Sequence, residues 1–153
     1  MNGVLALVGD LLVELGEEGE EAGVLPLQTL KEQLVALGNR QPIFVAVNEA
    51  ETLVGALTLA ESFAIYARGH YGVINEMVVA PEYRSTGVGT RLIHAAAEYG
   101  RSRGWVRLDV TAPESPRWQR TRQFYERLGF RLAGPKLKLM LTSPGDARRD
   151  DHG

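Results

Sequence analysis

The chain has 153 residues, and its 17 basic and 19 acidic side chains give a formal charge of −2. Hydrophobic residues make up 44% and charged residues 24%, which is typical of a globular domain and excludes a disordered chain. Because there is no cysteine, disulfides, thiolate metal sites and a cysteine nucleophile are excluded. No apolar run reaches the ~20 residues that span a bilayer, and the first ten residues lack the basic segment of a secretory signal. We therefore expect a cytoplasmic protein with no membrane partner.

The charge is unevenly divided along the chain. Residues 1–65 carry two basic and ten acidic side chains, a net charge of −8, whereas residues 66–153 carry fifteen basic and nine acidic side chains, a net charge of +6. One interpretation of this division is that an anionic ligand binds on one side and a cationic ligand on the other. The alternative is that the charges merely solvate exposed faces.

The first forty residues have the periodicity of two helices. Apolar residues recur at helical spacing over 4–15 and again over 27–37, which predicts helices that end near Gly16 and Gly38. An acidic connector interrupted by glycine, residues 17–21, separates them.

The next forty residues have the composition of strands. Residues 42–47, 52–66 and 71–79 are apolar and rich in β-formers, and turn residues separate them. They predict an antiparallel meander. Gly55 interrupts the second strand, which indicates a β-bulge or the close approach of another element.

A helix and a further strand follow. Helical spacing predicts a helix over 87–103 that ends at Gly104, and residues 106–110 have the pattern of a strand. A strand, a helix and a second strand within ~35 residues form a βαβ unit, so the strand over 106–110 should run parallel to the strand over 71–79.

One more helix is expected after these elements. Ser115 is the expected cap, with Pro116 at the first helical position, and Gly129 ends the helix. The arginines of this region resemble a nucleic-acid patch, but a solvated helix face is the simpler interpretation, so we expect no nucleic-acid partner. These arginines are Arg117, Arg120, Arg122, Arg127 and Arg131.

The end of the chain predicts two short strands and a tail. Residues 130–132 and 136–141 have the pattern of strands, whereas residues 142–153 are polar and contain proline and glycine. We expect a single domain over 1–141 and a flexible tail after it.

The most informative local feature is a glycine-rich loop between a strand and a helix. The strand over 71–79 ends at Pro81 and leads through Arg84–Thr90 into the helix. The first N–H groups of a helix lack intrahelical partners, and the helix dipole favours an anion there. Because Gly87 and Gly89 permit a positive φ and a close backbone approach, the loop is typical of a pyrophosphate site. The alternative is a tight turn that happens to contain glycines.

Two other phosphate motifs fit less well. A dinucleotide fingerprint needs Gly or Ala three residues after Gly89, where this chain has Leu92. A P-loop needs Gly-Lys-Ser/Thr, and no lysine occurs between Lys31 and Lys136.

Two linked motifs resemble the GNAT superfamily of acyl-CoA-dependent N-acetyltransferases. Residues 78–92 match its central motif: an apolar strand that ends in Val-x-Pro, then Tyr-Arg-x-x-Gly-x-Gly and a helix with Leu three residues later. The second signature, Phe-Tyr-Glu-x-x-Gly-Phe, lies at 124–130. The resemblance covers about residues 43–141. It departs from the family where Trp118 and Thr121 replace the usual Asn and Ala, and where a helical pattern replaces the usual first strand.

The resemblance implies an α/β (α+β) fold with a mixed, mostly antiparallel sheet, one splayed parallel strand pair, and flanking helices. Acetyl-CoA would lie between the two parallel strands. The backbone of Met77 and Val79 would hold the pantetheine arm, and the N–H of Val78 or Met77 would polarise the acyl carbonyl. The residues implied in binding the pyrophosphate are Arg84, Ser85, Thr86, Gly87, Val88, Gly89 and Thr90.

The resemblance also assigns chemistry to two side chains. An amine of pKa ~10 is mostly protonated at neutral pH, so its attack needs a base, and Glu76 is the candidate. Tyr125 has the position of the family's usual acid, which would protonate the departing CoA thiolate. The alternatives are a solvated or paired strand glutamate and a core aromatic. Asp109 and Glu114 are reserve bases, and Arg122 is the candidate for the 3′-phosphate.

The acceptor is expected to be a small-molecule primary amine that attacks directly in a ternary complex. In this family the first two helices and their connector usually wall the acceptor site. Here that region, residues 1–38, carries most of the −8 charge, which favours a small cationic amine. His70, His94 and His152 do not form a metal pattern, so no metal is expected. The alternatives are a non-catalytic CoA-binding sensor or assembly domain and a protein or peptide N-acetyltransferase, and a homodimer is left open.

Overall fold

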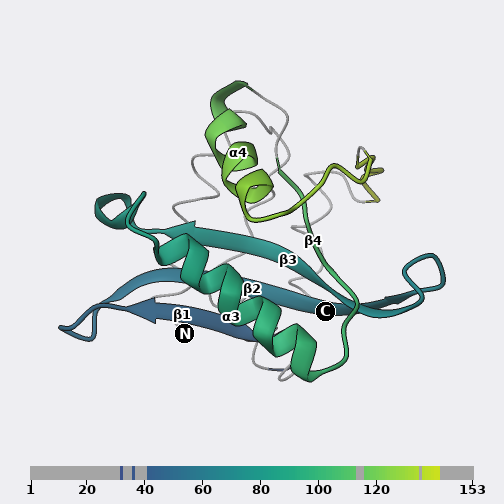
Figure 1. The fold of residues 1–153 in the computed structure, drawn as a ribbon, viewed down its shortest axis with the longest axis horizontal. Helices are drawn as coiled ribbons and strands as arrows, with labels where there is room; N and C mark the ends of the chain where they lie inside the picture. Colours follow the sequence, from purple (N-terminus) through teal and green to yellow (C-terminus); the bar gives the residue numbers. More distant parts are fainter. Residues whose placement is uncertain (1–31, 33–35, 37–40, 113–115, 135, 142–153) are drawn as a thin grey trace, which may run out of the picture.

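The computed structural model describes residues 32, 36, 41–112, 116–134 and 136–141 (Figure 1). Its elements in chain order are β1 (Ile43–Val47), β2 (Leu53–Ala64), β3 (Gly69–Val79), the 3₁₀ turn η2 (Pro81–Tyr83), α3 (Val88–Ser102), β4 (Leu108–Val110), the 3₁₀ turn η3 (Pro116–Trp118) and α4 (Gln119–Arg127). The expected first helix, the acidic connector, Ser115 and the tail lie outside the described residues. Of the expected second helix, Glu32 and Ala36 are described, and both are helical.

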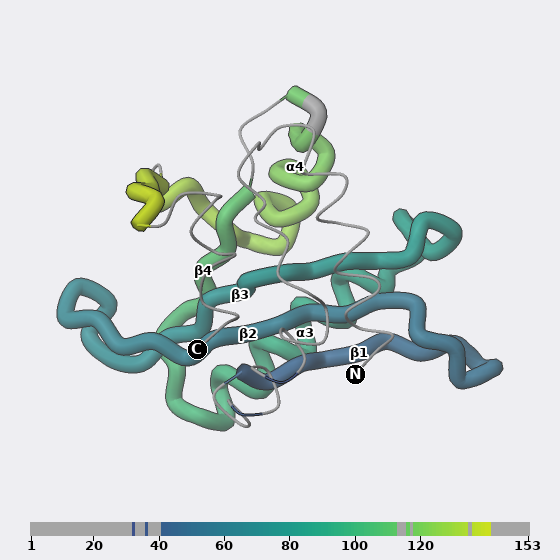
Figure 2. Tube along the Cα trace, turned by 180° about the vertical axis from the view of Figure 1, so that it is seen from behind, coloured from purple at the N-terminus to yellow at the C-terminus, as the bar shows by residue number. Residues whose placement is uncertain are grey.

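The four strands form one sheet in the order β1-β2-β3-β4. The first three pair in antiparallel fashion, and β3 pairs with β4 in parallel, so the predicted meander and the predicted parallel pair are both confirmed. Figure 1 shows α3 crossing one face of the sheet and α4 lying beyond β3, beside β4. In Figure 2, from behind, the opposite face of the sheet is seen with α3 at its back.

The parallel pair is short, and this opens the sheet. The two strands pair at Gly72–Leu108, Val73–Asp109 and Ile74–Val110 and nowhere beyond. Among the described strands, none therefore pairs with Glu76–Val79 on the β4 side. The splayed pair expected from the sequence is present.

The core lies between the sheet and the two helices. Helix α3 contributes Leu92, Ile93 and Ala96, all at most 4% exposed. The buried cluster consists of Leu57, Leu59, Ile74, Leu92, Ile93, Ala96, Trp105 and Tyr125. Gly55 allows α3 to approach β2, because a Cβ there would lie 3.0 Å from Val88 Cγ1 and 3.2 Å from Leu92 Cδ1.

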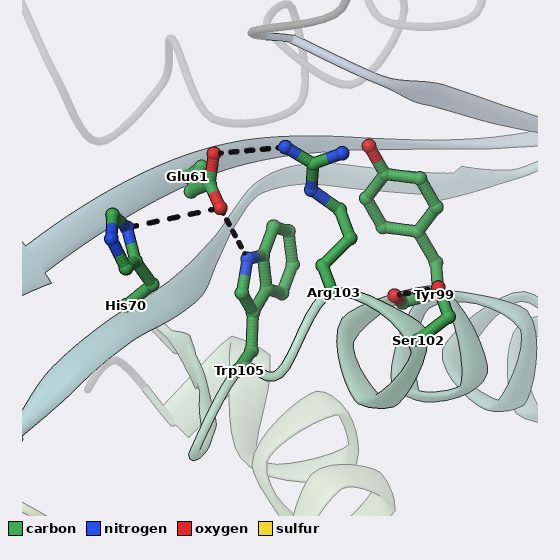
Figure 3. A network of polar contacts seen from close by, with 6 residues as sticks. All are labelled: Glu61, His70, Tyr99, Ser102, Arg103 and Trp105. Atoms are coloured by element: carbon green, nitrogen blue, oxygen red, sulfur yellow. Dashed lines mark hydrogen bonds and ion pairs between the residues drawn. The ribbon is translucent and has the colours of Figure 1, made fainter.

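A polar network centred on Glu61 connects the β2–β3 hairpin to the turn after α3 (Figure 3). Trp105 Nε1 donates to Glu61 Oε1 at 2.7 Å, and Arg103 Nη2 donates to Glu61 Oε2 at 3.3 Å. His70 Nδ1 lies 3.8 Å from Glu61 Oε1. The Trp105 hydrogen bond, followed by the Arg103 guanidinium, lowers the pKa of Glu61.

The sequence prediction is wrong for the start of α4. Pro116 belongs to η3, and α4 begins at Gln119 with Trp118 as its N-cap residue and no side-chain cap hydrogen bond. Proline favours the first turn of a helix because its φ is fixed and it lacks an N–H. That preference is met here by a 3₁₀ turn, which leads into the α-helix.

The two final strands expected over 130–132 and 136–141 are also absent from the described residues. Leu137 and Leu141 are each 90% exposed. An alternating pattern forms a strand only when a partner strand supplies hydrogen bonds. None of the described strands pairs with this segment, so the pattern alone does not produce one.

No helix in the described part of the chain is long and apolar enough to cross a bilayer.

Candidate active site

A β-bulge sets the orientation of Glu76. The register runs from Leu59–Ile74 directly to Thr58–Glu76, so Asn75 is an extra residue in β3. Such an insertion shifts the alternation of the strand by one residue, and Glu76 consequently shares a face with Thr58. The Thr58 hydroxyl donates to Glu76 Oε2 and accepts the Glu76 N–H at 3.0 Å. Glu76 is therefore a paired strand glutamate, which is compatible with a role as base.

The three residues after Glu76 alternate between the two faces of the sheet. Met77 and Val79 pack against the core under α3, whereas Val78 is 5% exposed and packs with Ala56 on the other face. Because no described strand pairs with their β4 side, this backbone edge is open to another partner. At the end of the strand, Arg84 Nε donates to the Val79 carbonyl at 3.2 Å.

The loop after β3 leads into an uncapped helix. Ser85 and Gly87 have φ values of 63° and 91°, in the left-handed region that Gly87 tolerates without cost. Arg91 N donates to Gly87 O at 3.1 Å, the first hydrogen bond of α3. Gly87, at the N-cap position, has no side chain that could cap the helix, and the first turn of α3 contains no acidic residue. The N–H groups of Gly87–Thr90 are therefore left without intrahelical partners, in a field that favours an anion.

The two loop glycines have different surroundings. A Cβ at Gly87 would meet no atom within 4 Å, so that this position opens to solvent. A Cβ at Gly89 would lie 3.2 Å from Phe124 Cζ and 3.7 Å from Met77 Cε. Gly89 therefore lets α4 and β3 pack against the first turn of α3, and all three elements meet at the candidate site.

The hydroxyls of the loop are not equivalent. The Thr86 hydroxyl donates to the Tyr83 carbonyl, and the Thr86 N–H donates to the same oxygen at 3.3 Å. Thr86 thus closes the turn with its own donors. Ser85 is exposed, and Thr90 is half-buried.

Tyr125 lies in the core, with its ring against other aromatic side chains. It is 6% exposed, and its ring centroid lies 5.3 Å from those of Phe124 and Phe130. Burial raises the pKa of Tyr125 to about 12. No residue of the described chain forms a hydrogen bond with its hydroxyl. The phenol is therefore protonated across the neutral range and has its proton available to donate.

The remaining candidate residues lie at the surface. On α4, Arg122 Nε donates to Glu126 Oε1 at 3.0 Å, and both side chains are about half exposed. Asp109 Oδ1 lies 2.9 Å from Arg107 Nε, and the Arg107 guanidinium lies over the rings of Tyr66 and Tyr71. Glu114 lies outside the described residues. No group of three metal-ligating side chains occurs in the described part of the chain.

A groove of about 850 Å³ lies at the other edge of the sheet, between β1 and the first half of α3. Its lining includes Val45, Asn48, Tyr83, Thr86 and Arg91. It does not include Glu76, Tyr125 or the open edge of β3, but it reaches the glycine-rich loop at Thr86 and Val88.

Thr58 was not anticipated from the sequence. It is the single polar residue in the buried run Val54–Leu59, and that isolation is the signal that could have found it. The contact between Gly89 and Phe124 has no comparable signal, because it depends on how two helices pack.

The model of the acetyltransferase (GNAT) family matches residues 10–130, and the chain therefore belongs to this family. A glucosamine 6-phosphate N-acetyltransferase from Trypanosoma brucei brucei is 36% identical over 70 residues, which are 46% of this chain and 44% of that relative. This chain thus matches less than half the length of that relative.

Solved structures agree with the family assignment. An acetyltransferase from Trypanosoma brucei is 26% identical, with a TM-score of 0.67 over 92% of each chain. An aminoglycoside acetyltransferase from an uncultured soil metagenomic sample has a TM-score of 0.73 over 91% of this chain and 88% of its own, at 21% identity. The second likeness shows the fold alone.

Proposed function

We propose that this protein transfers the acetyl group of acetyl-CoA to the primary amine of a small molecule. The observation that carries the proposal is the meeting of an uncapped helix N-terminus with an unpaired strand edge. The first turn of α3 contacts Met77 through Gly89, and Met77 is part of the edge that β4 leaves open. Together they offer donors for an anion beside backbone groups for an extended chain of amides.

The described residues fit CoA as a substrate. The N–H groups of Gly87–Thr90, with the backbone of Ser85, would hold the pyrophosphate, since no acidic side chain competes in the first turn of α3. The N–H groups of Arg84 and Thr86 already donate to the carbonyls of Pro81 and Tyr83. The backbone of Met77 and Val79 would pair with the pantetheine amides. Arg122 is the candidate for the 3′-phosphate, because its pairing with Glu126 is exposed and such surface pairs cost little to break.

Two side chains would move protons. Acetyl-CoA supplies a thioester whose acetyl carbon the amine attacks. Glu76 would take a proton from the ammonium group, directly or through water, to make the amine nucleophilic. The N–H of Val78 or Met77 would stabilise the oxyanion. Tyr125 would give its proton to the CoA sulfur as the C–S bond of the thioester breaks. Its phenol is neutral at the pH of the reaction, and burial makes it a weaker acid than that of an exposed tyrosine.

The acceptor is proposed to be a small molecule because the relative from Trypanosoma brucei brucei is named for one. The preference for a cationic amine rests on acidic residues of the first half of the chain, most of which lie outside the described residues. A panel of acceptors therefore separates the possibilities. It should contain glucosamine 6-phosphate, a neutral amine, a polyamine and a peptide with a free N-terminus.

Calorimetry and a thiol-release assay test the proposal. We expect acetyl-CoA to bind, and we expect at least one small amine of the panel to release CoA thiol. Binding without turnover of any acceptor would favour a CoA-binding sensor or assembly domain. Turnover of the peptide alone would favour a protein N-acetyltransferase.

A further inference from the structure

Thr58 is a polar side chain at a buried position of β2, where an apolar side chain would be expected. Among the described residues, it is the single buried polar residue, at 5% exposure. Burying a hydroxyl is costly unless it is hydrogen-bonded. Valine has nearly the same shape and an equal preference for strands, and it would fill the position without that cost. The hydroxyl is therefore explained by its contacts rather than by its packing.

Both contacts of the hydroxyl are made with one residue. Thr58 Oγ1 donates to Glu76 Oε2 and accepts the Glu76 N–H at 3.0 Å. The accepted N–H orients the lone pairs of Oγ1, and this directs its proton to the carboxylate. Because the N–H belongs to the residue that follows the bulge at Asn75, the hydroxyl fixes the bulge and the side chain of Glu76 together.

The other carboxylate oxygen of Glu76, Oε1, is available to accept a proton. No residue of the described chain donates a hydrogen bond to Glu76 Oε1. A carboxylate held through one oxygen keeps a fixed direction while the other oxygen can accept a proton. Pre-organisation of a base in this way raises the rate without changing how tightly the substrate binds.

We propose that Thr58 is the positioning residue for Glu76 in acetyl transfer. This inference rests on the proposed function and adds to it a residue that touches neither acetyl-CoA nor the acceptor. It acts through the Glu76 carboxylate and through the backbone at the bulge.

A double-mutant cycle tests the inference. The variants are Thr58→Val, Thr58→Ser, Glu76→Gln and the double variant Thr58→Val with Glu76→Gln. We expect Thr58→Val to lower kcat about ten-fold, on the scale of a hydrogen bond to a charged group, with the KM for acetyl-CoA within about two-fold of wild type. Thr58→Ser retains the hydroxyl and should restore most of the rate. In the Glu76→Gln background, Thr58→Val should lower kcat no further.

Ser62→Ala is the matched control, since it removes a hydroxyl from the same strand face, four residues from Thr58. We expect its effect on kcat to be the same with Glu76 and with Gln at position 76. Urea unfolding of every variant, monitored by circular dichroism, shows whether each protein is folded under assay conditions.

The outcomes separate the two proposals. Equal losses from Thr58→Val in both backgrounds, or failure of Thr58→Ser to restore the rate, would overturn the positioning role and leave the acetyltransferase proposal intact. If the wild-type protein binds acetyl-CoA but turns over no amine of the panel, the proposed function fails, and the positioning role fails with it. Thr58→Val that does not fold would leave Thr58→Ser to decide, since a folded but slow serine variant contradicts the inference.

Discussion

At the scale of single residues, Tyr125 combines two properties that the sequence presents as alternatives. Its ring is a core aromatic between Phe124 and Phe130, and its hydroxyl has no hydrogen-bond partner among the described residues. The same burial that makes the ring part of the core also raises the pKa of the phenol to about 12. A core position therefore keeps the phenol protonated at neutral pH, as a proton donor must be, and it also makes the phenol a weaker acid than that of an exposed tyrosine.

The first prediction follows from that unpartnered hydroxyl. Tyr125→Phe keeps the ring and its contacts, so stability at neutral pH should change by less than about 1 kcal/mol. If the phenol protonates the leaving thiolate, kcat should fall about 100-fold, within the usual range for general acid catalysis. Thiol release at saturating acceptor measures the rate. An unchanged kcat in a folded Tyr125→Phe protein would remove Tyr125 from the mechanism.

The second prediction concerns stability at alkaline pH. The pKa of Tyr125 is raised from 10.0 to about 12 by burial. Since the unfolded chain loses this proton first, the stabilisation is complete below pH 10 and is lost as the pH rises through 12. Wild type should therefore lose roughly 2–3 kcal/mol more than Tyr125→Phe between these limits. Urea unfolding at pH 9 and at the highest pH where unfolding is still reversible measures the difference. Parallel dependence of stability on pH in wild type and Tyr125→Phe would contradict the prediction.

At the scale of elements, the N-terminus of α3 takes part in packing and is also the proposed pyrophosphate site, and its two glycines have different surroundings. Gly89 allows Phe124 and Met77 to approach, which joins α4 and β3 to the helix. Gly87 has a positive φ of 91° and open space around its missing Cβ. Substitution at Gly87 therefore changes the backbone and the access to the N–H groups, without displacing a neighbouring side chain.

The third prediction compares Gly87 with a matched glycine at the other end of α3. Gly104 also has a positive φ, of 76°, and no atom near its missing Cβ. Gly87→Val and Gly104→Val should each destabilise the fold by about 1–2 kcal/mol through backbone strain. Gly87→Val alone should weaken acetyl-CoA binding, by at least about ten-fold, because the proposed anion site lies at that end of the helix. Calorimetry measures both affinities, and equal affinities for the two variants would count against the loop as the pyrophosphate site.

How far the elements follow from the sequence depends on whether the signal is local. The strands β1 to β3 are correctly predicted because alternation and turn residues lie within each hairpin, and α3 is predicted because its apolar positions have helical spacing. The final strands are not formed, since Leu137 and Leu141 have the right pattern but no described partner strand. The bulge at Asn75 could not be predicted, because an extra residue is visible only in the register between two strands. The roles of Glu76 and Tyr125 were implied by motifs and stay predictions.

At the scale of the whole molecule, the network at Glu61 joins parts that the chain separates by about forty residues. Trp105 fills the space beside Gly72, where a Cβ would lie 2.3 Å from its ring, and its indole N–H reaches Glu61. The β2–β3 hairpin is thus fastened to the turn from α3 to β4. The pairing of β3 with β4 begins at Gly72 and ends at Ile74. The network at Glu61 therefore stabilises the end of the two strands at which they are hydrogen-bonded to each other.

The fourth prediction is that this network makes stability depend on acid. The pKa of Glu61 is lowered from 4.5, chiefly by the hydrogen bond from Trp105. The stabilisation is therefore present above pH 4.5 and is lost as the pH falls below it, when the folded carboxylate takes up a proton. Glu61→Gln should lose less stability than wild type between pH 6 and pH 3. The control is Glu98→Gln, which removes a carboxylate that is 80% exposed on the surface of α3. Urea unfolding should give Glu98→Gln the wild-type slope with pH, and a wild-type slope for Glu61→Gln would refute the prediction.

The extra residue at Asn75 also affects how this strand can be compared with others. Counting forward from Ile74 without the bulge would place the Glu76 carboxylate on the face of Leu57 and would turn Met77 away from α3. A deletion at this position would therefore be far more harmful than most substitutions, because it exchanges the faces of every residue up to Val79. An alignment that closes a one-residue gap here would match an acidic residue of one chain with a core residue of another. Related chains should accordingly be aligned first on the glycine-rich loop that follows β3. The residue equivalent to Glu76 is then found by counting back from that loop.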